Sequence, residues 1–186
     1  MKILCLFLAV AAHGATLRYW IDPCPTAEHV CHAGDVDLAQ WAIEAWQSAS
    51  GGRLKLEKAP SAAKAHIRVY WSGGRDGLYG EAQPITVDGV RGAEVYVVTP
   101  AERMSDDLLR DTIVYLTCLH ETGHALGLAH TAQFADIMYN FQYGGDIGEY
   151  FGRYRRKLEN RFDIRRNPGM SEDDRRRIVE LSGARK

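Results

Sequence analysis

The sequence lacks an excess of charge of either sign, a long apolar run and an internal repeat. Its 23 lysines and arginines nearly balance its 24 aspartates and glutamates, which leaves a formal net charge of −1. This balance argues against a protein that neutralises phosphates or anionic lipid over its whole surface, so we expect no nucleic-acid partner. The apolar run at residues 3–12 is shorter than the about 20 residues that span a bilayer, so we expect no stable membrane insertion. One ordinary globular domain is the default expectation.

The first residues have the layout of a secretory signal peptide. Lys2 precedes the apolar run, and the small residues Gly14 and Ala15 follow it. We expect residues 1–15 to be a signal peptide that is cleaved near Gly14 or Ala15, which places the mature chain, residues 16–186, outside the cell or in the periplasm. A buried first strand is the alternative interpretation of the run.

Cysteine is scarce, and the number left after the signal peptide is odd. Cys24, Cys31 and Cys118 remain in a compartment where disulfides can form. A short loop closed by Cys24 and Cys31 is the favoured pairing, although the histidines within and beside that loop also allow a small metal site. Cys118 is then a buried thiol or the partner in another disulfide.

The spacing of apolar residues predicts a mixture of strands and helices. Strands are predicted at 17–22, 54–59, 66–71 and 94–98, with a possible short extended piece at 78–83, and helices at 36–49, from 105 to about 126 and from 171. Ser105 is the expected start of the second helix, and Ser171 with Asp174 is the expected reciprocal cap of the last one. Many glycines favour loops between residues 72 and 92. We therefore expect an α+β fold with about five strands.

The segment HETGHALGLAH, residues 120–130, carries the chemistry. His120 and His124 are four residues apart, so they present two imidazoles on one face of a helix. Gly127 accepts positive φ at little steric cost, which allows the chain to turn and return His130 as a third ligand. Cys118 lies about 200° around the helix from His120 and points away from this site.

Three imidazoles suit zinc, and they leave a position open for a water whose pKa the metal lowers to about 7. Glu121, next to the first ligand, is placed to take the proton of that water and to deliver it to a leaving amine. Cobalt or another late divalent metal can also bind three nitrogen ligands. The pattern predicts metal-assisted hydrolysis of a peptide bond. A zinc-containing module that binds peptides without cutting them is the alternative, and the presence of Glu121 favours catalysis.

These residues, followed by DIMY at 136–139, resemble the metzincin peptidases and, within them, the matrixins. The resemblance implies a catalytic domain over residues 16–186 with a twisted mixed sheet, an active-site helix, a C-terminal helix and a Met-turn at Met138 beneath the three histidines. It also implies a secreted zinc endopeptidase that acts on polypeptides, and we expect a monomer. Asn140 stands where astacin-like members have tyrosine, which favours the matrixin side.

The chain departs from the matrixin pattern in ways that limit the resemblance. It lacks the histidine-rich and aspartate-rich loop that holds structural zinc and calcium in animal matrixins, so the resemblance does not extend to such extra ions and leaves them open. No cysteine-switch sequence precedes the first strand, so we expect no latency through an ordinary prosegment. Thr131 and Asn140 stand where serine and proline are usual.

A long basic segment separates Met138 from the last helix. Its cations are Arg153, Arg155, Arg156, Lys157, Arg161, Arg165 and Arg166. One hypothesis is a lid or pocket wall whose cations favour acidic or polar residues near the cut. The other is a solvated basic helix whose apolar side chains, Tyr150, Phe151, Tyr154, Leu158 and Phe162, pack inward.

Overall fold

The computed structural model describes residues 15–24, 31–32, 34–73, 79–100 and 104–184. The expected signal peptide, apart from Ala15, lies outside these residues, as does the Leu78 end of the predicted extended piece. The elements in chain order are β1 (Ala15–Ile21), α1 (Asp35–Ala49), β2 (Leu54–Lys58), η1 (Ala62–Lys64), β3 (Ile67–Ser72), β4 (Gly80–Val87), β5 (Val90–Val98), α2 (Asp107–Ala125), η2 (Phe141–Tyr143), α3 (Ile147–Arg155), α4 (Asp163–Arg166) and α5 (Glu172–Ala184). The predicted α+β class is confirmed.

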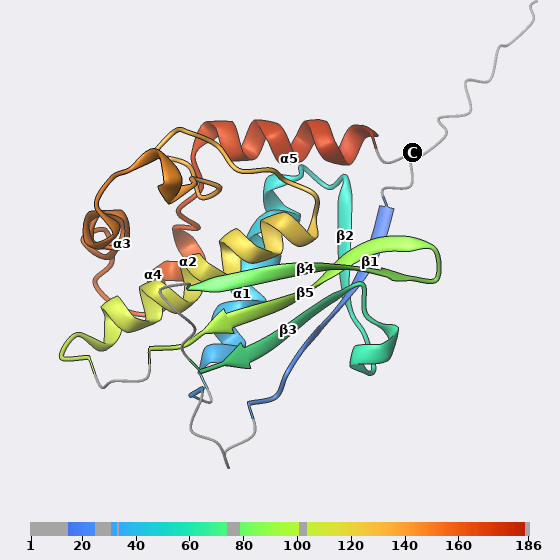
Figure 1. Ribbon diagram of the computed structural model, residues 1–186, viewed down its shortest axis with the longest axis horizontal. Coiled ribbons are helices and arrows are strands. Elements are labelled where there is room, and N and C mark those ends of the chain that lie inside the picture. Colours follow the sequence, from blue (N-terminus) through green and yellow to red (C-terminus); the bar gives the residue numbers. More distant parts are fainter. Residues whose placement is uncertain (1–14, 25–30, 33, 74–78, 101–103, 185–186) are drawn as a thin grey trace, which may run out of the picture.

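The strands of the described chain form one mixed sheet in the order β2-β1-β3-β5-β4. Neighbouring strands are parallel except for β4, which runs antiparallel to β5 at the edge. Alternate residues such as Leu17, Val69 and Val95 are buried in a core that also contains Ile43 of α1 and Leu119 of α2. Figure 1 shows both helices on the same side of the sheet. β4 is an edge strand of this sheet, and it lies beside α2.

The prediction that loops dominate between residues 72 and 92 is wrong for its second half, because β4 and the start of β5 occupy most of residues 80–92. The possible extended piece at 78–83 is correct over residues 80–83, which form the first half of β4. Asp88 and Gly89 join the strands with φ of 52° and 77°, the two positive values that a type I′ hairpin turn requires. Pro84 lies within β4, which an edge strand tolerates because one side of its backbone has no partner strand. Proline and exposed side chains thus conceal the second half of this strand in the sequence.

The long helix α2 begins one residue later than predicted and ends where expected. Asp106, not Ser105, is its N-cap, and the Asp106 side chain accepts a hydrogen bond from the backbone N–H of Leu109 at 3.0 Å. A carboxylate can cap free amides and also suits the positive end of the helix dipole. Gly127 has a φ of 96°, so the chain turns away there as predicted.

The cysteines take the favoured arrangement. Cys24 and Cys31 form a disulfide, and Cys118 is a free, fully buried thiol whose pKa burial raises well above its usual value. Within the described residues, no helix has both the length and the apolar character needed to cross a bilayer.

Candidate metal centre

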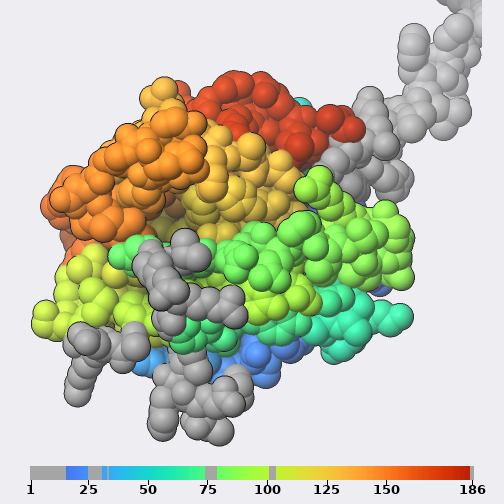
Figure 2. All heavy atoms as spheres, viewed as in Figure 1, coloured from blue at the N-terminus to red at the C-terminus, as the bar shows by residue number. Residues whose placement is uncertain are grey.

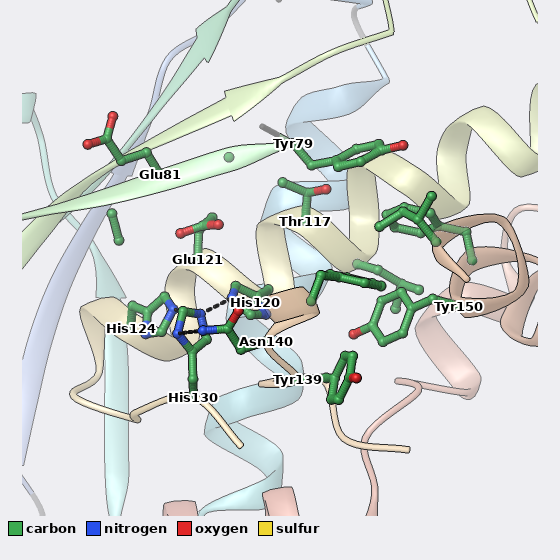
Figure 3. Close-up of a pocket in the computed structure, with 16 residues that line it drawn as sticks. Tyr79, Glu81, Thr117, His120, Glu121, His124, His130, Tyr139, Asn140 and Tyr150 are labelled. Carbon is green, nitrogen blue, oxygen red and sulfur yellow. Dashed lines mark hydrogen bonds between the residues drawn. The ribbon is translucent and has the colours of Figure 1, made fainter. Parts of the chain in front are cut away.

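Three imidazoles meet at one point beside the C-terminal half of α2. Nε2 of His130 lies 3.1 Å from Nε2 of His120 and 3.0 Å from Nε2 of His124. Among the described residues, these three histidines are the group that can hold a metal ion, with ligand atoms within 4.8 Å of one another. Figure 3 shows all three rings pointing toward a common centre. The helical spacing and the turn at Gly127 bring the three predicted ligands together.

Backbone carbonyls fix how the two helical histidines present their nitrogens. His120 Nδ1 lies 2.7 Å from the carbonyl oxygen of Ile137, and His124 Nδ1 lies 2.8 Å from that of Leu128. A carbonyl oxygen only accepts, so each Nδ1 carries a proton and each Nε2 keeps its lone pair toward the centre. Burial lowers the pKa of His120 to about 4 and also lowers that of His124. Neutral imidazoles with inward lone pairs fit zinc.

Met138 lies directly against α2 at Gly123. It is fully buried, and a Cβ placed on Gly123, between His120 and His124 on the helix, would lie 2.5 Å from the Met138 sulfur. The backbone of Thr131 holds this turn in place, because its N–H donates to the carbonyl oxygen of Met138 at 2.8 Å. The absence of a side chain at Gly123 therefore allows the close approach.

The C-terminal helix supports the same turn through Asp174. Ser171 and Asp174 form the predicted reciprocal cap, with hydrogen bonds of 2.9 and 3.0 Å. The same carboxylate also accepts a hydrogen bond from the N–H of Ile137 at 2.8 Å, and Ile137 supplies the carbonyl that orients His120. The cap is a local pattern that sequence reveals, whereas the contact with Ile137 joins distant segments and left no signal in the sequence.

Glu121 lies between β4 and the imidazoles, as Figure 3 shows. Its side chain lines the cavity, yet the residue is only 7% exposed. Burial, with a smaller contribution from Glu81, raises the pKa of Glu121 to about 8. A cation held by the histidines would lower this pKa, because it favours the carboxylate form. A Cβ on Gly80 would lie 2.7 Å from Glu121 Cγ, so Gly80 lets β4 approach α2 closely; sequence analysis did not identify this role.

A cavity of about 500 Å³ extends from the histidines toward α3. Figure 2 shows the surface hollowed between β4 in green and the orange segment that contains α3. Its apolar and aromatic lining consists of Tyr79, Ala82, Leu116, Tyr139, Phe141, Ile147, Tyr150 and Phe151. The rings of Tyr79 and Phe151 lie 5.0 Å apart, so the edge strand and α3 meet at one end. The hydroxyl of Tyr150 donates to the carbonyl oxygen of Ile137 at 3.1 Å, and the Tyr150 ring forms part of the cavity wall.

The basic segment supplies part of the cavity wall but not with its cations. Ile147, Tyr150 and Phe151 line the cavity, whereas none of the seven predicted cations does. Instead, several of these cations form ion pairs elsewhere, namely Arg155 with Asp106, Arg156 with Glu149 and Arg165 with Glu44. Arg153 lies beside the cavity wall, with its guanidinium carbon 4.7 Å from the centre of the Tyr150 ring. The lining supports the hypothesis of a pocket wall, and it gives no support to the hypothesis that these cations select acidic residues.

The packing expected for the alternative, inward aromatic side chains, is correct except at one position. Tyr150, Phe151, Tyr154 and Leu158 are buried, but Phe162 is 66% exposed. Phe162 directly precedes the short helix α4, and its ring lies 6.2 Å from that of Trp41. A single exposed apolar side chain is common, because apolar atoms contribute more than half of the accessible surface of a folded protein.

The mixed sheet, the helix with two inward imidazoles and the third imidazole after a glycine turn define the metzincin class of metallopeptidases. The family model described as matrixin, of the M10 peptidases, matches residues 13–147, and the chain belongs to this family. A comparison with curated proteins gives no match. The chain is thus a metallopeptidase of a zinc-using family. The matched range ends at Ile147, so α3 apart from its first residue, α4 and α5 lie beyond it.

Proposed function

We propose that the chain is an exported zinc endopeptidase in which His120, His124 and His130 hold the metal and Glu121 is the general base. The position of Glu121 carries this proposal. It is a nearly buried carboxyl at the cavity, one residue from the first ligand, where a cation held by the histidines favours its carboxylate form. A carboxylate at a cleft beside a metal site is placed to act as a general base.

Zinc, when bound, lowers the pKa of a water to about 7 and polarises the carbonyl that is attacked. Residues of the protein transfer the proton and orient the ligands. One carboxylate oxygen of Glu121 accepts a proton from the attacking water and then returns it to the leaving amine. The carbonyls of Ile137 and Leu128 keep the helical imidazoles in the tautomer that ligation needs. Met138 forms the floor that fixes the ligands from below.

The edge strand and the cavity support a polypeptide substrate. β4 ends the sheet, so an extended peptide can add to it by backbone hydrogen bonds that accept many sequences. One side chain next to the cut then enters the cavity, whose walls near α3 are aromatic and aliphatic. We therefore expect the enzyme to accept many peptide sequences and to prefer an apolar side chain at the one substrate position that enters the cavity.

The proposal also covers export and domain organisation. Residues 1–15 are the signal peptide and residues 16–186 one catalytic domain, active as a monomer. The disulfide between Cys24 and Cys31 agrees with an oxidising compartment. Expression of the full chain in a bacterium, followed by N-terminal sequencing of the exported protein, tests this part; retention of Met1 in a cytoplasmic product would contradict it.

Peptides blocked at both ends distinguish an endopeptidase from an exopeptidase. We expect the purified chain to cut such a peptide internally, to lose this activity with a strong chelator and to regain it when zinc is added back. Mass spectrometry of the products locates the cut. Cleavage only of peptides with a free terminus would contradict the assignment as an endopeptidase.

A further inference from the structure

Asn140 joins the third histidine to the wall of the cavity. Its Oδ1 accepts a hydrogen bond from the N–H of Gln142 at 2.9 Å, which makes it the N-cap of η2. Its Nδ2 lies 3.1 Å from Nδ1 of His130. Because η2 begins with Phe141, a residue of the cavity wall, one amide side chain contacts both functional parts. Figure 3 shows this contact beside the imidazoles.

The network determines which end of the amide faces which partner. The backbone N–H of Gln142 is a donor, so it requires the carbonyl oxygen of Asn140. The amide nitrogen, which only donates, is then left facing His130. Turning the amide over would bring two donors together at Gln142. The cap of η2 and a donor toward His130 therefore occur together.

This arrangement differs from that of the other two histidines. His120 and His124 face carbonyl oxygens, which accept a proton from Nδ1. His130 Nδ1 faces a donor, so this contact is a hydrogen bond only if Nδ1 keeps its lone pair. A neutral imidazole that ligates through Nε2 carries its proton on Nδ1. The present contact and ligation by His130 therefore cannot both be satisfied.

We propose that Asn140 is a positioning residue that couples ligation by His130 to the start of the cavity wall. Ligation turns the amide oxygen of Asn140 toward His130 and removes the cap from η2, so the segment Phe141–Tyr143 loses one of its anchors. A second side-chain anchor remains, because the hydroxyl of Tyr139 donates to the carbonyl oxygen of Gly144 at 2.9 Å. The inference rests on the proposed metal site and adds a link between that site and the substrate cavity.

The variant Asn140→Asp removes the conflict while keeping the shape of the side chain. A carboxylate accepts from the Gln142 N–H and from the His130 Nδ1–H at once. Partners of metal-bound histidines change metal affinity by about 10–100-fold. We expect Asn140→Asp to bind zinc at least about tenfold more tightly than the parent, in competition with a coloured chelator, with the full chain folded in each sample.

Asn140→Ala tests whether the gain in zinc affinity comes from removal of the opposing donor. It adds no charge, and it also removes any support that the side chain gives to His130. It removes the opposing donor along with the cap, so zinc should bind at least as tightly as in the parent. The folded state should lose about 1 kcal/mol through the missing cap, which denaturant unfolding measures. The charge control is Gln142→Glu, at an exposed position two residues on, with an expected change below about threefold.

The result that would overturn the coupling is weaker zinc binding by Asn140→Ala, or no gain by Asn140→Asp, while the parent binds one zinc per chain. Equal gains by Asn140→Asp and Gln142→Glu would also overturn it, since charge alone would then explain them. If the parent itself binds no zinc, the proposed metal site fails together with the inference. The same titration therefore tells the two failures apart.

Discussion

At the scale of the residue, the hydrogen-bond partner decides what each histidine can do. His120 and His124 have their Nδ1 atoms held by carbonyl oxygens, which frees Nε2 for a metal. His66 has the opposite arrangement: it is buried, and its Nδ1 accepts a hydrogen bond from the backbone N–H of Arg18 at 2.9 Å. Its role is therefore structural.

This role of His66 predicts a dependence of stability on pH. Burial, and secondarily the charge of Arg18, lower the pKa of His66 below its ordinary value of 6.5, while Asp88 opposes them. His66 then takes up a proton more readily in the unfolded chain than in the folded chain. The free energy of unfolding therefore falls as the pH falls through 6.5. His66→Asn keeps an acceptor that does not titrate, and it should show a shallower fall. Urea unfolding of both proteins in saturating zinc measures this; identical slopes would contradict it.

At the scale of the element, the approach of Met138 to α2 depends on a helix position without a side chain. A methyl group at Gly123 would meet the Met138 sulfur at 2.5 Å and Trp46 at 3.0 Å, both in the buried core. We predict that Gly123→Ala destabilises the fold by about 1–3 kcal/mol, as overpacking does, and weakens zinc binding. Gly183→Ala is the matched control, because a Cβ there meets nothing within 4 Å. Thermal unfolding compares them, and equal melting temperatures would refute the packing argument.

The elements that the sequence predicted well are those with local signals. The helix at residues 36–49, the glycine stop of α2 and the reciprocal cap of α5 depend on neighbours within one or two turns. Only the first half of β4 was predicted, as the extended piece at 78–83, because an edge strand with Gly80 and Pro84 lacks the alternation of a half-buried strand. Asp106 was missed as the cap because the adjacent Ser105 is an equally good candidate by residue type.

The metal-binding part of the candidate site was also predictable because its signals are local, whereas the parts that depend on distant segments were not. One segment, residues 120–130, encodes all three histidines and Glu121 through helical spacing and a glycine turn. The apolar cavity could not be predicted, because Tyr79 and Phe151 come from segments that are joined only by the fold. The basic character of the segment after Met138 also misled, since its ion pairs with distant residues such as Glu44 are invisible in sequence.

At the scale of the whole molecule, a buried ion pair joins the two helices that cover the sheet. Arg110 of α2 donates two hydrogen bonds, of 2.7 and 2.8 Å, to the carboxylate of Asp35 at the start of α1, and both side chains are almost fully buried. Desolvated pairs of this kind tolerate the loss of one partner poorly, because the other charge is left without compensation.

Arg110→Met should therefore lower the free energy of unfolding by about 3–5 kcal/mol. The control is Arg165→Met, which breaks the exposed pair with Glu44 and should cost less than about 1 kcal/mol. Denaturant unfolding of both variants in the same buffer gives the comparison. A similar small loss in both would show that the buried pair adds nothing to the joining of α1 and α2.

The central claim is that the three histidines hold one zinc and that Glu121 acts as the base. The most direct measurement is cleavage of an unstructured protein such as casein by the mature chain and by Glu121→Gln, with zinc content determined on the same samples. We predict one zinc per chain in both and a loss of activity by at least about 100-fold in the variant, the usual contribution of a general base. Equal activity in the two proteins at equal zinc content would contradict the role of Glu121.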